Sequence, residues 1–184
     1  MALIPPQAAV RSPPARWAAA GIIAAVVAAD QVTKSLVLAG RIAGGTGWAA
    51  VRLVRNTGSA GGLESGRPVL VSLLALAITG AAVVALLRAR RAAVVVALSF
   101  VVAGAAGNLA DRLLRAPGLG RGAVVDWIHF AGGGGSMNIS DLAINAGAIG
   151  LVIALLATRE KTAGRRGAGR EGEPSAGTAG ERAG

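Results

Sequence analysis

The chain alternates between long apolar runs and short polar segments. Four runs stand out, at residues 17–39, 68–87, 92–110 and 139–157. The hydrocarbon core of a bilayer is about 30 Å thick, so a helix rising about 1.5 Å per residue needs roughly 20 apolar residues to cross it. Backbone polar groups find no water in lipid, which excludes irregular segments of this length. The pattern therefore predicts a small polytopic membrane protein with four transmembrane helices.

The first run has a second interpretation, as a cleaved signal peptide, because Arg11 and Arg16 precede an apolar stretch. The apolar pattern resumes beyond Asp30 and three further runs follow, which favours a retained helix.

The C-terminal segment differs from the rest of the chain. Residues 158–184 are rich in Gly, Ala, Arg and Glu and show no hydrophobic periodicity. Such a composition buries too little apolar surface to fold. The sequence thus predicts a membrane domain over residues 1–157 and a disordered basic tail over residues 158–184.

Composition supports the membrane assignment and removes several kinds of chemistry. Hydrophobic residues make up 53% of the chain and charged residues only 15%. The chain has no cysteine, which excludes disulfides, thiol nucleophiles and sulfur-ligated metals. Its single histidine, His129, cannot form a zinc site of the H-E-x-x-H type.

The distribution of basic residues predicts the orientation. Three arginines lie in the short turn 88–91, and further basic residues lie in the N-terminal arm and in the tail. The positive-inside rule places these regions in the cytoplasm, and four spans then put both termini there. The net charge of +10 is split between the two faces without interleaved aromatic residues, so contact with lipid headgroups explains it better than nucleic acid.

The acidic residues give the main functional signal. The chain has four aspartates, and all of them lie at or near the predicted outward ends of spans one, three and four: Asp30, Asp111, Asp126 and Asp141. Ionisable groups at such positions are costly and by default indicate a functional site.

Two of these aspartates have basic neighbours at helical spacing. Asp30 and Lys34 are four residues apart and share a helix face, which predicts a structural ion pair. Asn108, Asp111 and Arg112 also share a face. Asp111 and Arg112 either hold each other or an adjoining loop, while Asn108 and Arg112 are alternatively substrate contacts.

Asp126 has no basic neighbour. It lies in "GAVVDWIHF", where apolar and aromatic residues surround it. A carboxyl group in such surroundings has a raised pKa, whereas the alternative is a solvent-facing Asp on a short loop strand.

Asp141 begins the last apolar run, where a carboxylate is either a helix cap or a catalytic group. Asn138 or Ser140 could cap the same helix. A glycine-rich loop connects this region to Asp126 and allows the two carboxyl groups to approach. One ionised and one protonated carboxyl group sharing a site form an acid/base pair that activates water for peptide hydrolysis.

The sequence resembles the lipoprotein signal peptidases (signal peptidase II), an intramembrane aspartic peptidase family. The resemblance spans most of the predicted membrane domain. Five sequence blocks carry it, in family order: "DQVTK", "RNTGSAGG", "GNLADR", "VVDWI" and "MNISDLAIN".

The resemblance implies a membrane-embedded endopeptidase that removes signal peptides from diacylglyceryl-modified prolipoproteins, cutting on the amino side of the lipidated cysteine. It implies an all-α bacterial inner-membrane protein with an extracytoplasmic β-cradle near residues 41–66, where "WAAVRLVRN" fits a strand. No metal or organic cofactor is expected, membrane lipids are the expected surroundings, and nothing demands more than a monomer.

The resemblance also implies roles for individual residues. Asp126 and Asp141 match the catalytic dyad. Five positions match residues that line or order the substrate site: Asn56, Gly58, Asn108, Arg112 and Asn138. Asp30, Lys34 and Asp111 match polar positions that we assign to the scaffold.

The chain departs from the family pattern next to Asp141. The family motif usually reads Phe-Asn-x-Ala-Asp, whereas Met137 and Ser140 replace the Phe and the Ala here. Ser140 adds a hydroxyl that we expect beside the dyad, where it could tune protonation. The preceding loop is replaced by glycines, which leaves the dyad spacing open.

Three other interpretations compete. A proton- or ion-coupled transporter would use the aspartates as a relay, but it predicts carboxylates near the middle of the membrane. A Ser–Lys peptidase would depend on Lys34, yet Ser35 points about 100° away from it on a helix. A non-enzymatic scaffold would use the aspartates only as caps.

Overall fold

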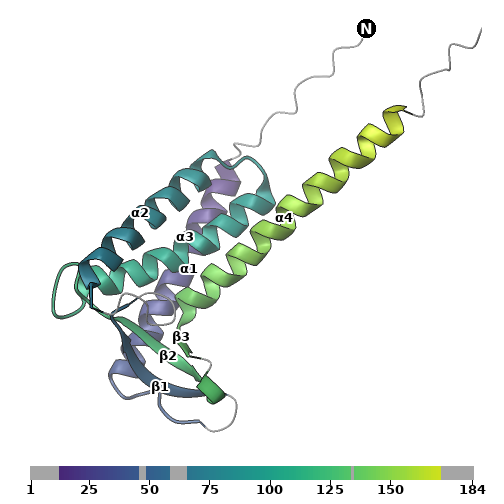
Figure 1. Cartoon of the computed structure of the whole chain (residues 1–184). Helices are drawn as coiled ribbons and strands as arrows, with labels where there is room; N and C mark the ends of the chain where they lie inside the picture. The colour runs from purple at the N-terminus through teal and green to yellow at the C-terminus, as the bar shows by residue number, and fades with distance from the viewer. Residues whose placement is uncertain (1–12, 46–48, 59–65, 134, 171–184) are drawn as a thin grey trace, which may run out of the picture. The chain divides into compact units, whose positions relative to one another are not determined.

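The computed structural model describes residues 13–45, 49–58, 66–133 and 135–170 (Figure 1). It divides into two compact units, Met1–Leu151 and Val152–Gly184, and every residue of the candidate site lies in the first. The boundary falls inside the last helix. The division predicted from the sequence, at residues 157 and 158, stays a prediction.

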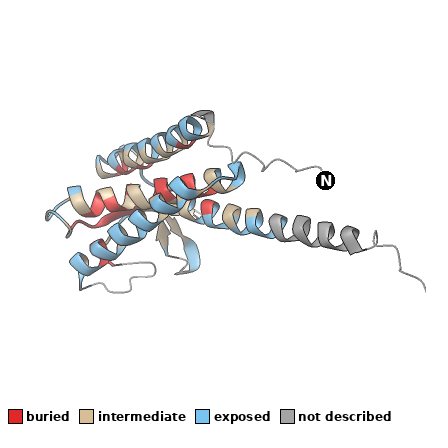
Figure 2. Ribbon diagram, turned by 90° about the horizontal axis from the view of Figure 1, so that it is seen from above, coloured by how far each residue is buried: buried red, intermediate tan, exposed pale blue. Residues whose placement is uncertain are grey.

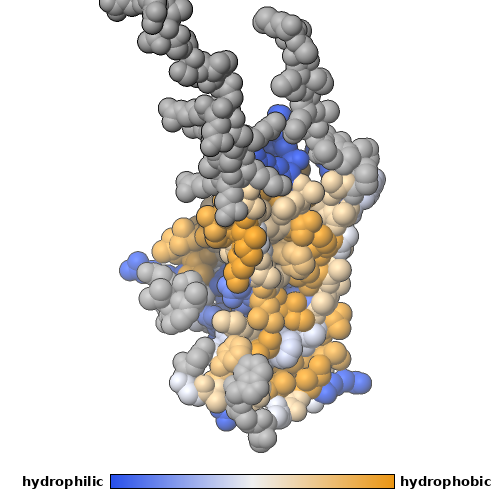
Figure 3. All heavy atoms as spheres, turned by 90° about the vertical axis from the view of Figure 1, so that its right-hand side faces the viewer, coloured by the Kyte–Doolittle hydropathy of each residue, from blue (hydrophilic) through white to orange (hydrophobic). Residues whose placement is uncertain are grey.

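In the part of the chain that the structure describes, four helices are long and apolar enough to cross a membrane: Ala15–Leu38, Pro68–Arg88, Ala92–Leu114 and Ile139–Ala157. They lie within α1 (Pro13–Leu38), α2 (Pro68–Arg88), α3 (Ala92–Leu114) and α4 (Ile139–Arg170). Figure 3 shows apolar side chains over much of one face of the molecule. The four predicted spans are confirmed. The third extends past its predicted end, so that Asp111 and Arg112 lie within the helix.

Local sequence signals set the helix ends. α1 ends at Leu38, and Gly40, two residues later, has a φ of 65°, in the left-handed region. The Gly40 N–H bonds Val37 O and the Arg41 N–H bonds Leu36 O. This pair of bonds is a Schellman cap. α2 begins at Pro68, because proline at the first helical position lacks only an N–H that has no helical partner there.

α4 continues through Arg170, beyond the predicted end of the fourth span. The helix thus includes residues 158–170, while the disorder of the C-terminal tail stays a prediction. The rest of the predicted tail, residues 171–184, lies outside the described residues.

A three-stranded antiparallel sheet lies at one end of α1–α3 and at the start of α4 (Figure 1). Its strands run in the order β1 (Ala49–Asn56), β2 (Val124–Phe130) and β3 (Ser136–Met137). The predicted β-cradle is confirmed for β1, whereas the sequence analysis did not place β2 and β3 in it. Residues 46–48 and 59–65 of the predicted cradle lie outside the described residues.

A β-bulge interrupts the pairing of β1 with β2. Val51 pairs with Ile128 and Val54 pairs with Asp126, so two residues of β1 lie opposite Trp127 alone. Directly paired residues share a face of the sheet, and the extra residue therefore puts Val51 and Val54 on the same face as Asp126. Asn56, two residues after Val54, lies on this face as well.

Helix α3 is the centre of the first unit. It packs against both α1 and α2, and buried residues are concentrated along it (Figure 2). Glycines let α4 approach α3 closely. A Cβ at Gly104 would overlap the backbone oxygen of Ser140, and one at Gly147 would lie 2.6 Å from Ala97 O. Small residues of this kind permit close backbone packing in membrane helices.

We predict that Gly104→Ala lowers the free energy of unfolding in detergent by about 1–3 kcal/mol, because the new methyl group forces α3 and α4 apart. The change is measured as a lower melting temperature. Gly80→Ala in α2 is the matched control, since a Cβ there meets nothing within 4 Å. It should keep or slightly raise the melting temperature. Equal melting temperatures for the two variants would contradict close α3–α4 packing.

Candidate active site

The two candidate catalytic aspartates lie on different elements that meet at the sheet end of the helices. Asp126 is on β2, and its exposed fraction is 3%. Asp141 is in the first turn of α4 and is partly exposed.

Asp141 has the geometry of a helix cap. Asn138 Oδ1 accepts the Asp141 backbone N–H at 2.9 Å, and Asp141 Oδ2 accepts the Asn138 backbone N–H at 3.1 Å. These reciprocal bonds form a capping box, in which each side chain satisfies an N–H that the helix leaves without a partner. Asp141 Oδ1 takes no part in the capping box, so the same carboxyl group can cap α4 and also have a chemical role.

Two asparagine side chains connect the carboxyl groups. The Asn138 amide nitrogen donates to Asp126 Oδ1 at 2.6 Å and to Asn108 Oδ1 at 3.1 Å. The Asn108 amide nitrogen in turn donates to Asp141 Oδ1 at 2.8 Å. Each aspartate thus receives an amide N–H, and the two amides are bonded to each other. Asn138, which is fully buried, is the central residue of this network.

The end of β1 completes the surroundings of Asp126. Asn56 Nδ2 donates to Asp126 Oδ2 at 3.2 Å, and Gly58 N–H bonds Asn56 Oδ1 at 3.0 Å. The buried Arg112 donates from Nη2 to Gly58 O at 2.9 Å and from Nη1 to Asn108 O at 3.3 Å. The structure therefore brings all five predicted substrate-site residues into one network with the two aspartates.

The pKa of Asp126 is raised to about 6. Burial is the largest cause and the negative charge of Asp141 adds to it, while hydrogen bonds from Asn56 and Asn138 act in the opposite direction. The direction agrees with the prediction from the apolar flanks, but the surroundings do not. The apolar residues that flank Asp126 in the sequence predicted apolar neighbours, whereas two amides contact its carboxyl group.

A second polar cluster lies beside the first. Lys34 Nζ is 2.7 Å from Asp30 Oδ2 and 2.8 Å from Asp111 Oδ2, and all three side chains are buried. The predicted Asp30–Lys34 pair is thereby confirmed as a contact.

Of the two alternatives for Asp111 and Arg112, the structure supports contacts with adjoining segments. Arg112 donates to Gly58 O, and Asp111 Oδ2 accepts the Val125 N–H. Asp111 Oδ1 bonds Arg115 Nε at 2.6 Å.

Sequence reasoning missed two members of this cluster, Arg115 and Gln31. Gln31 Nε2 donates to Asp111 Oδ1 at 3.2 Å, and Arg115 Nη2 donates to Gln31 Oε1 at 3.2 Å. The spacing of Asp111 and Arg115, one helical turn apart, was a usable signal. No comparable signal identifies Gln31, because most of its side-chain partners belong to another helix, α3.

Ser140 differs from its predicted place. Its backbone N–H bonds Asp30 Oδ1 at 3.0 Å, and its hydroxyl faces Gly107 near Asp30 Oδ2. The side chain therefore points to the Lys34 cluster instead of the dyad, because consecutive residues of a helix point about 100° apart. The Ser–Lys alternative also loses support, since Ser35 Oγ donates to Gln31 O and Lys34 is engaged by two carboxylates.

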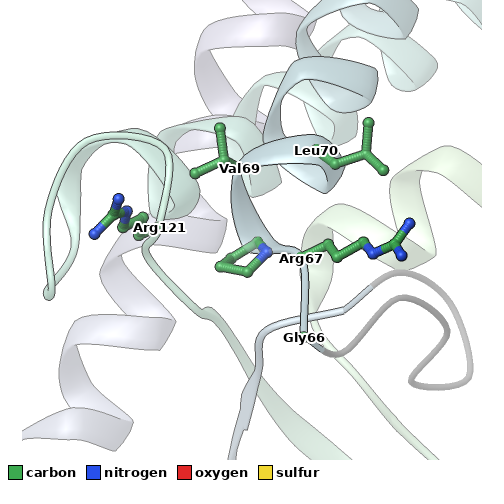
Figure 4. A pocket seen from close by; sticks show the side chains of 6 residues that line it. Gly66, Arg67, Val69, Leu70 and Arg121 are labelled. Atoms are coloured by element: carbon green, nitrogen blue, oxygen red, sulfur yellow. The ribbon is translucent and has the colours of Figure 1, made fainter.

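Neither a metal site nor the hollow in Figure 4 coincides with the dyad. Within the described residues, no group of three or more His, Cys, Asp or Glu side chains is placed to hold a metal ion. The hollow has a volume of about 440 Å³ and is lined by Gly66, Arg67, Pro68, Val69, Leu70 and Arg121. It contains none of the predicted site residues, and its two arginines extend to opposite sides in Figure 4.

Comparisons with known proteins agree on one family. The model of the family described as Signal peptidase (SPase) II matches residues 22–157. A lipoprotein signal peptidase of Bifidobacterium longum subsp. infantis is 37% identical over 140 residues, which cover 73% of this chain and 76% of the relative. The lipoprotein signal peptidase of Rhodococcus jostii is 36% identical over 152 residues, which cover 79% of this chain and 76% of the relative.

Solved structures give the same picture. A bacterial membrane enzyme determined by the in meso method at 2.3 Å resolution matches with a TM-score of 0.68 and 29% sequence identity. The match covers 79% of this chain and 91% of that one. On the strength of the family match over most of its length and of these relatives, the chain belongs to the signal peptidase II family of membrane peptidases.

Proposed function

We propose that this protein is an aspartic endopeptidase that removes the signal peptide from prolipoproteins at the surface of the bacterial membrane. The observation that carries the proposal is the pair of carboxyl groups, Asp126 and Asp141, connected through the amides of Asn108 and Asn138. Family membership and relatives named lipoprotein signal peptidase support it. They support the peptidase and give no support to the transporter alternative.

The surroundings of the two aspartates suggest different roles. Asp141 lies at the N-terminus of α4 and accepts a backbone N–H, and both interactions stabilise negative charge. Asp126 is buried, and its pKa of about 6 favours the protonated form more than that of an ordinary Asp. We therefore assign Asp141 as the general base and Asp126 as the general acid.

The reaction then needs only these two groups and water. Asp141 takes a proton from a water molecule, whose oxygen attacks the carbonyl carbon of the scissile peptide bond. Asp126 gives its proton to the leaving amide nitrogen, and the C–N bond breaks. The two carboxyl groups exchange protonation states in the process and return to the starting state by transfer to solvent.

The same network supports the proposed substrate contacts. Asn56, Asn108 and Asn138 hold the carboxyl groups, while Arg112 connects α3 to the end of β1 through Gly58 O. A substrate chain beside the dyad would therefore meet the end of β1 and this face of α3. The proposed cleavage site is the amino side of a cysteine that carries diacylglycerol, and we propose that the enzyme acts as a monomer.

We further propose that both termini are cytoplasmic, so that the sheet and the dyad lie at the outer surface. Arg88, Arg90 and Arg91 are exposed in the turn between α2 and α3, at the ends opposite the sheet. Dense basic residues in a short loop favour the cytoplasmic side.

The dyad predicts a large loss of activity from single, nearly isosteric changes. Asp126→Asn and Asp141→Asn should each lower kcat by about 10³-fold or more, because each removes one proton-transfer group. Cleavage is measured as a gel shift of a diacylated prolipoprotein in detergent. His129→Gln, on the same strand as Asp126, is the control for general damage to β2 and should stay active. Full activity in either aspartate variant would refute the dyad.

The orientation predicts the location of fused reporters. After Arg91, a reporter that works only in the cytoplasm should be active, and one that works only outside the membrane should be inactive. After Leu119, in the connection from α3 to β2, the two reporters should behave in the opposite way. The reverse pattern would invert the topology and place the dyad at the inner surface.

A further inference from the structure

We propose that Lys34 is a positioning residue for Asp141 and acts through the side chain of Asn108. The inference rests on the proposed dyad. It gives Lys34 a role in catalysis beyond the structural ion pair that its spacing from Asp30 predicts.

The hydrogen bonds of Lys34 use its whole donor capacity. Its ammonium group has three N–H bonds and no acceptor. Two of them meet Asp30 and Asp111, and the third meets Asn108 Oδ1 at 3.2 Å. The Lys34 side chain has no exposed surface, so water cannot replace any of these partners. A buried N–H needs a hydrogen-bond partner, and Asn108 Oδ1 supplies it for the third N–H of Lys34.

That third bond fixes the orientation of the Asn108 amide. An asparagine side chain has an acceptor oxygen and a donor nitrogen, and a half turn about its last bond exchanges them. Lys34 can only donate, and Asn138 Nδ2 also donates to the same oxygen at 3.1 Å. The Asn108 oxygen must therefore face Lys34 and Asn138.

The amide nitrogen of Asn108 then has one direction left. It points at Asp141 Oδ1, to which it donates at 2.8 Å. The reverse orientation would put the amide oxygen against a carboxylate and the amide N–H groups against an ammonium. Lys34 thus acts on Asp141 across one intervening side chain, and it prevents the repulsive arrangement.

The same cluster also holds the start of α4. Asp30 bonds Lys34 through Oδ2 and accepts the Ser140 backbone N–H through Oδ1 at 3.0 Å. Loss of Lys34 alone would leave Asp30 and Asp111 buried without their shared cation, at a high cost in stability. A test of the positioning role must therefore keep the buried charges balanced.

The test is a double-mutant cycle in an Asp30→Asn background. Replacing both Asp30 and Lys34 removes one anion and one cation, so the variants without Lys34 keep the charge balance of the cluster. Asn at position 30 keeps one oxygen, which accepts either the Ser140 N–H or a Lys34 N–H, and every comparison is therefore made within this background. Four proteins are compared at saturating prolipoprotein: the Asp30→Asn background, this background with Lys34→Met, with Asn108→Ala, and with both changes. Folding of each is checked by size-exclusion chromatography and thermal unfolding in detergent.

We expect Lys34→Met to lower kcat about tenfold while Asn108 is present, and less than about twofold once Asn108 is alanine. Asn108→Ala itself should lower kcat about 100-fold, as removal of one well-placed donor does. A purely structural role for Lys34 would give the same loss in both settings, and that result would overturn the proposal. KM should be little changed by Lys34→Met.

Two further variants give a rescue and a control. Lys34→Gln in the same background keeps an N–H donor for Asn108 Oδ1 and should recover most of the kcat lost in Lys34→Met. Folded but unrescued Lys34→Gln protein would contradict the proposal. Arg115→Gln removes another cation of the cluster, one that contacts Asp111 and Gln31, and should leave kcat within about twofold.

Asp141→Asn, measured beside the cycle, separates the two hypotheses. Activity in Asp141→Asn would refute the dyad itself. An inactive Asp141→Asn together with additive effects of Lys34 and Asn108 would leave the dyad intact and refute only the positioning role.

Discussion

The fold of this protein depends on providing hydrogen-bond partners and counter-charges for acidic side chains that the membrane domain buries. Asp30, Asp111 and Asp126 are each at most 3% exposed. A buried carboxylate without partners would be unstable, so the surrounding elements must be arranged to supply them. Lys34 and Arg115 neutralise Asp30 and Asp111, whereas the hydrogen bonds that Asp126 accepts from described side chains come from the neutral amides of Asn56 and Asn138. This difference separates a balanced, structural cluster from a site in which a proton can be exchanged.

The two clusters are parts of one assembly of helix ends. α1 contributes Lys34, α3 contributes Asn108 and Arg112, and the first turn of α4 contributes Asp141. Gly104 lets α4 approach α3, and the Val125 backbone N–H bonds Asp111 Oδ2 at 3.1 Å, which ties β2 to α3. A sub-ångström displacement of α4 or β2 would therefore change both the buried ion pairs and the spacing of the dyad. The packing of α4 and β2 against α3 therefore sets the positions of the two carboxyl groups.

Much of this arrangement could be predicted from the sequence, because it depends on local patterns. Four apolar runs predicted the spans, and helical spacing predicted the contact of Asp30 with Lys34. The strand pairing could not be predicted in the same way. Pairing of β1 with β2 joins residues about 70 positions apart, and the bulge opposite Trp127 has no sequence signal that we can identify. Gln31 and the direction of Ser140 depend on contacts between helices, which a single sequence does not reveal.

The central claim is that Asp126 and Asp141 form one electrostatically coupled site. Infrared titration of protein labelled with ¹³C at the Asp carboxyl groups tests it directly, with Asp126→Asn used to assign the band of Asp126. This carboxyl group is expected to ionise with a pKa of about 6, and with a lower pKa in Asp141→Asn, where a neighbouring negative charge is lost. An ordinary Asp midpoint in the unmodified protein, or a midpoint that Asp141→Asn leaves unchanged, would contradict it.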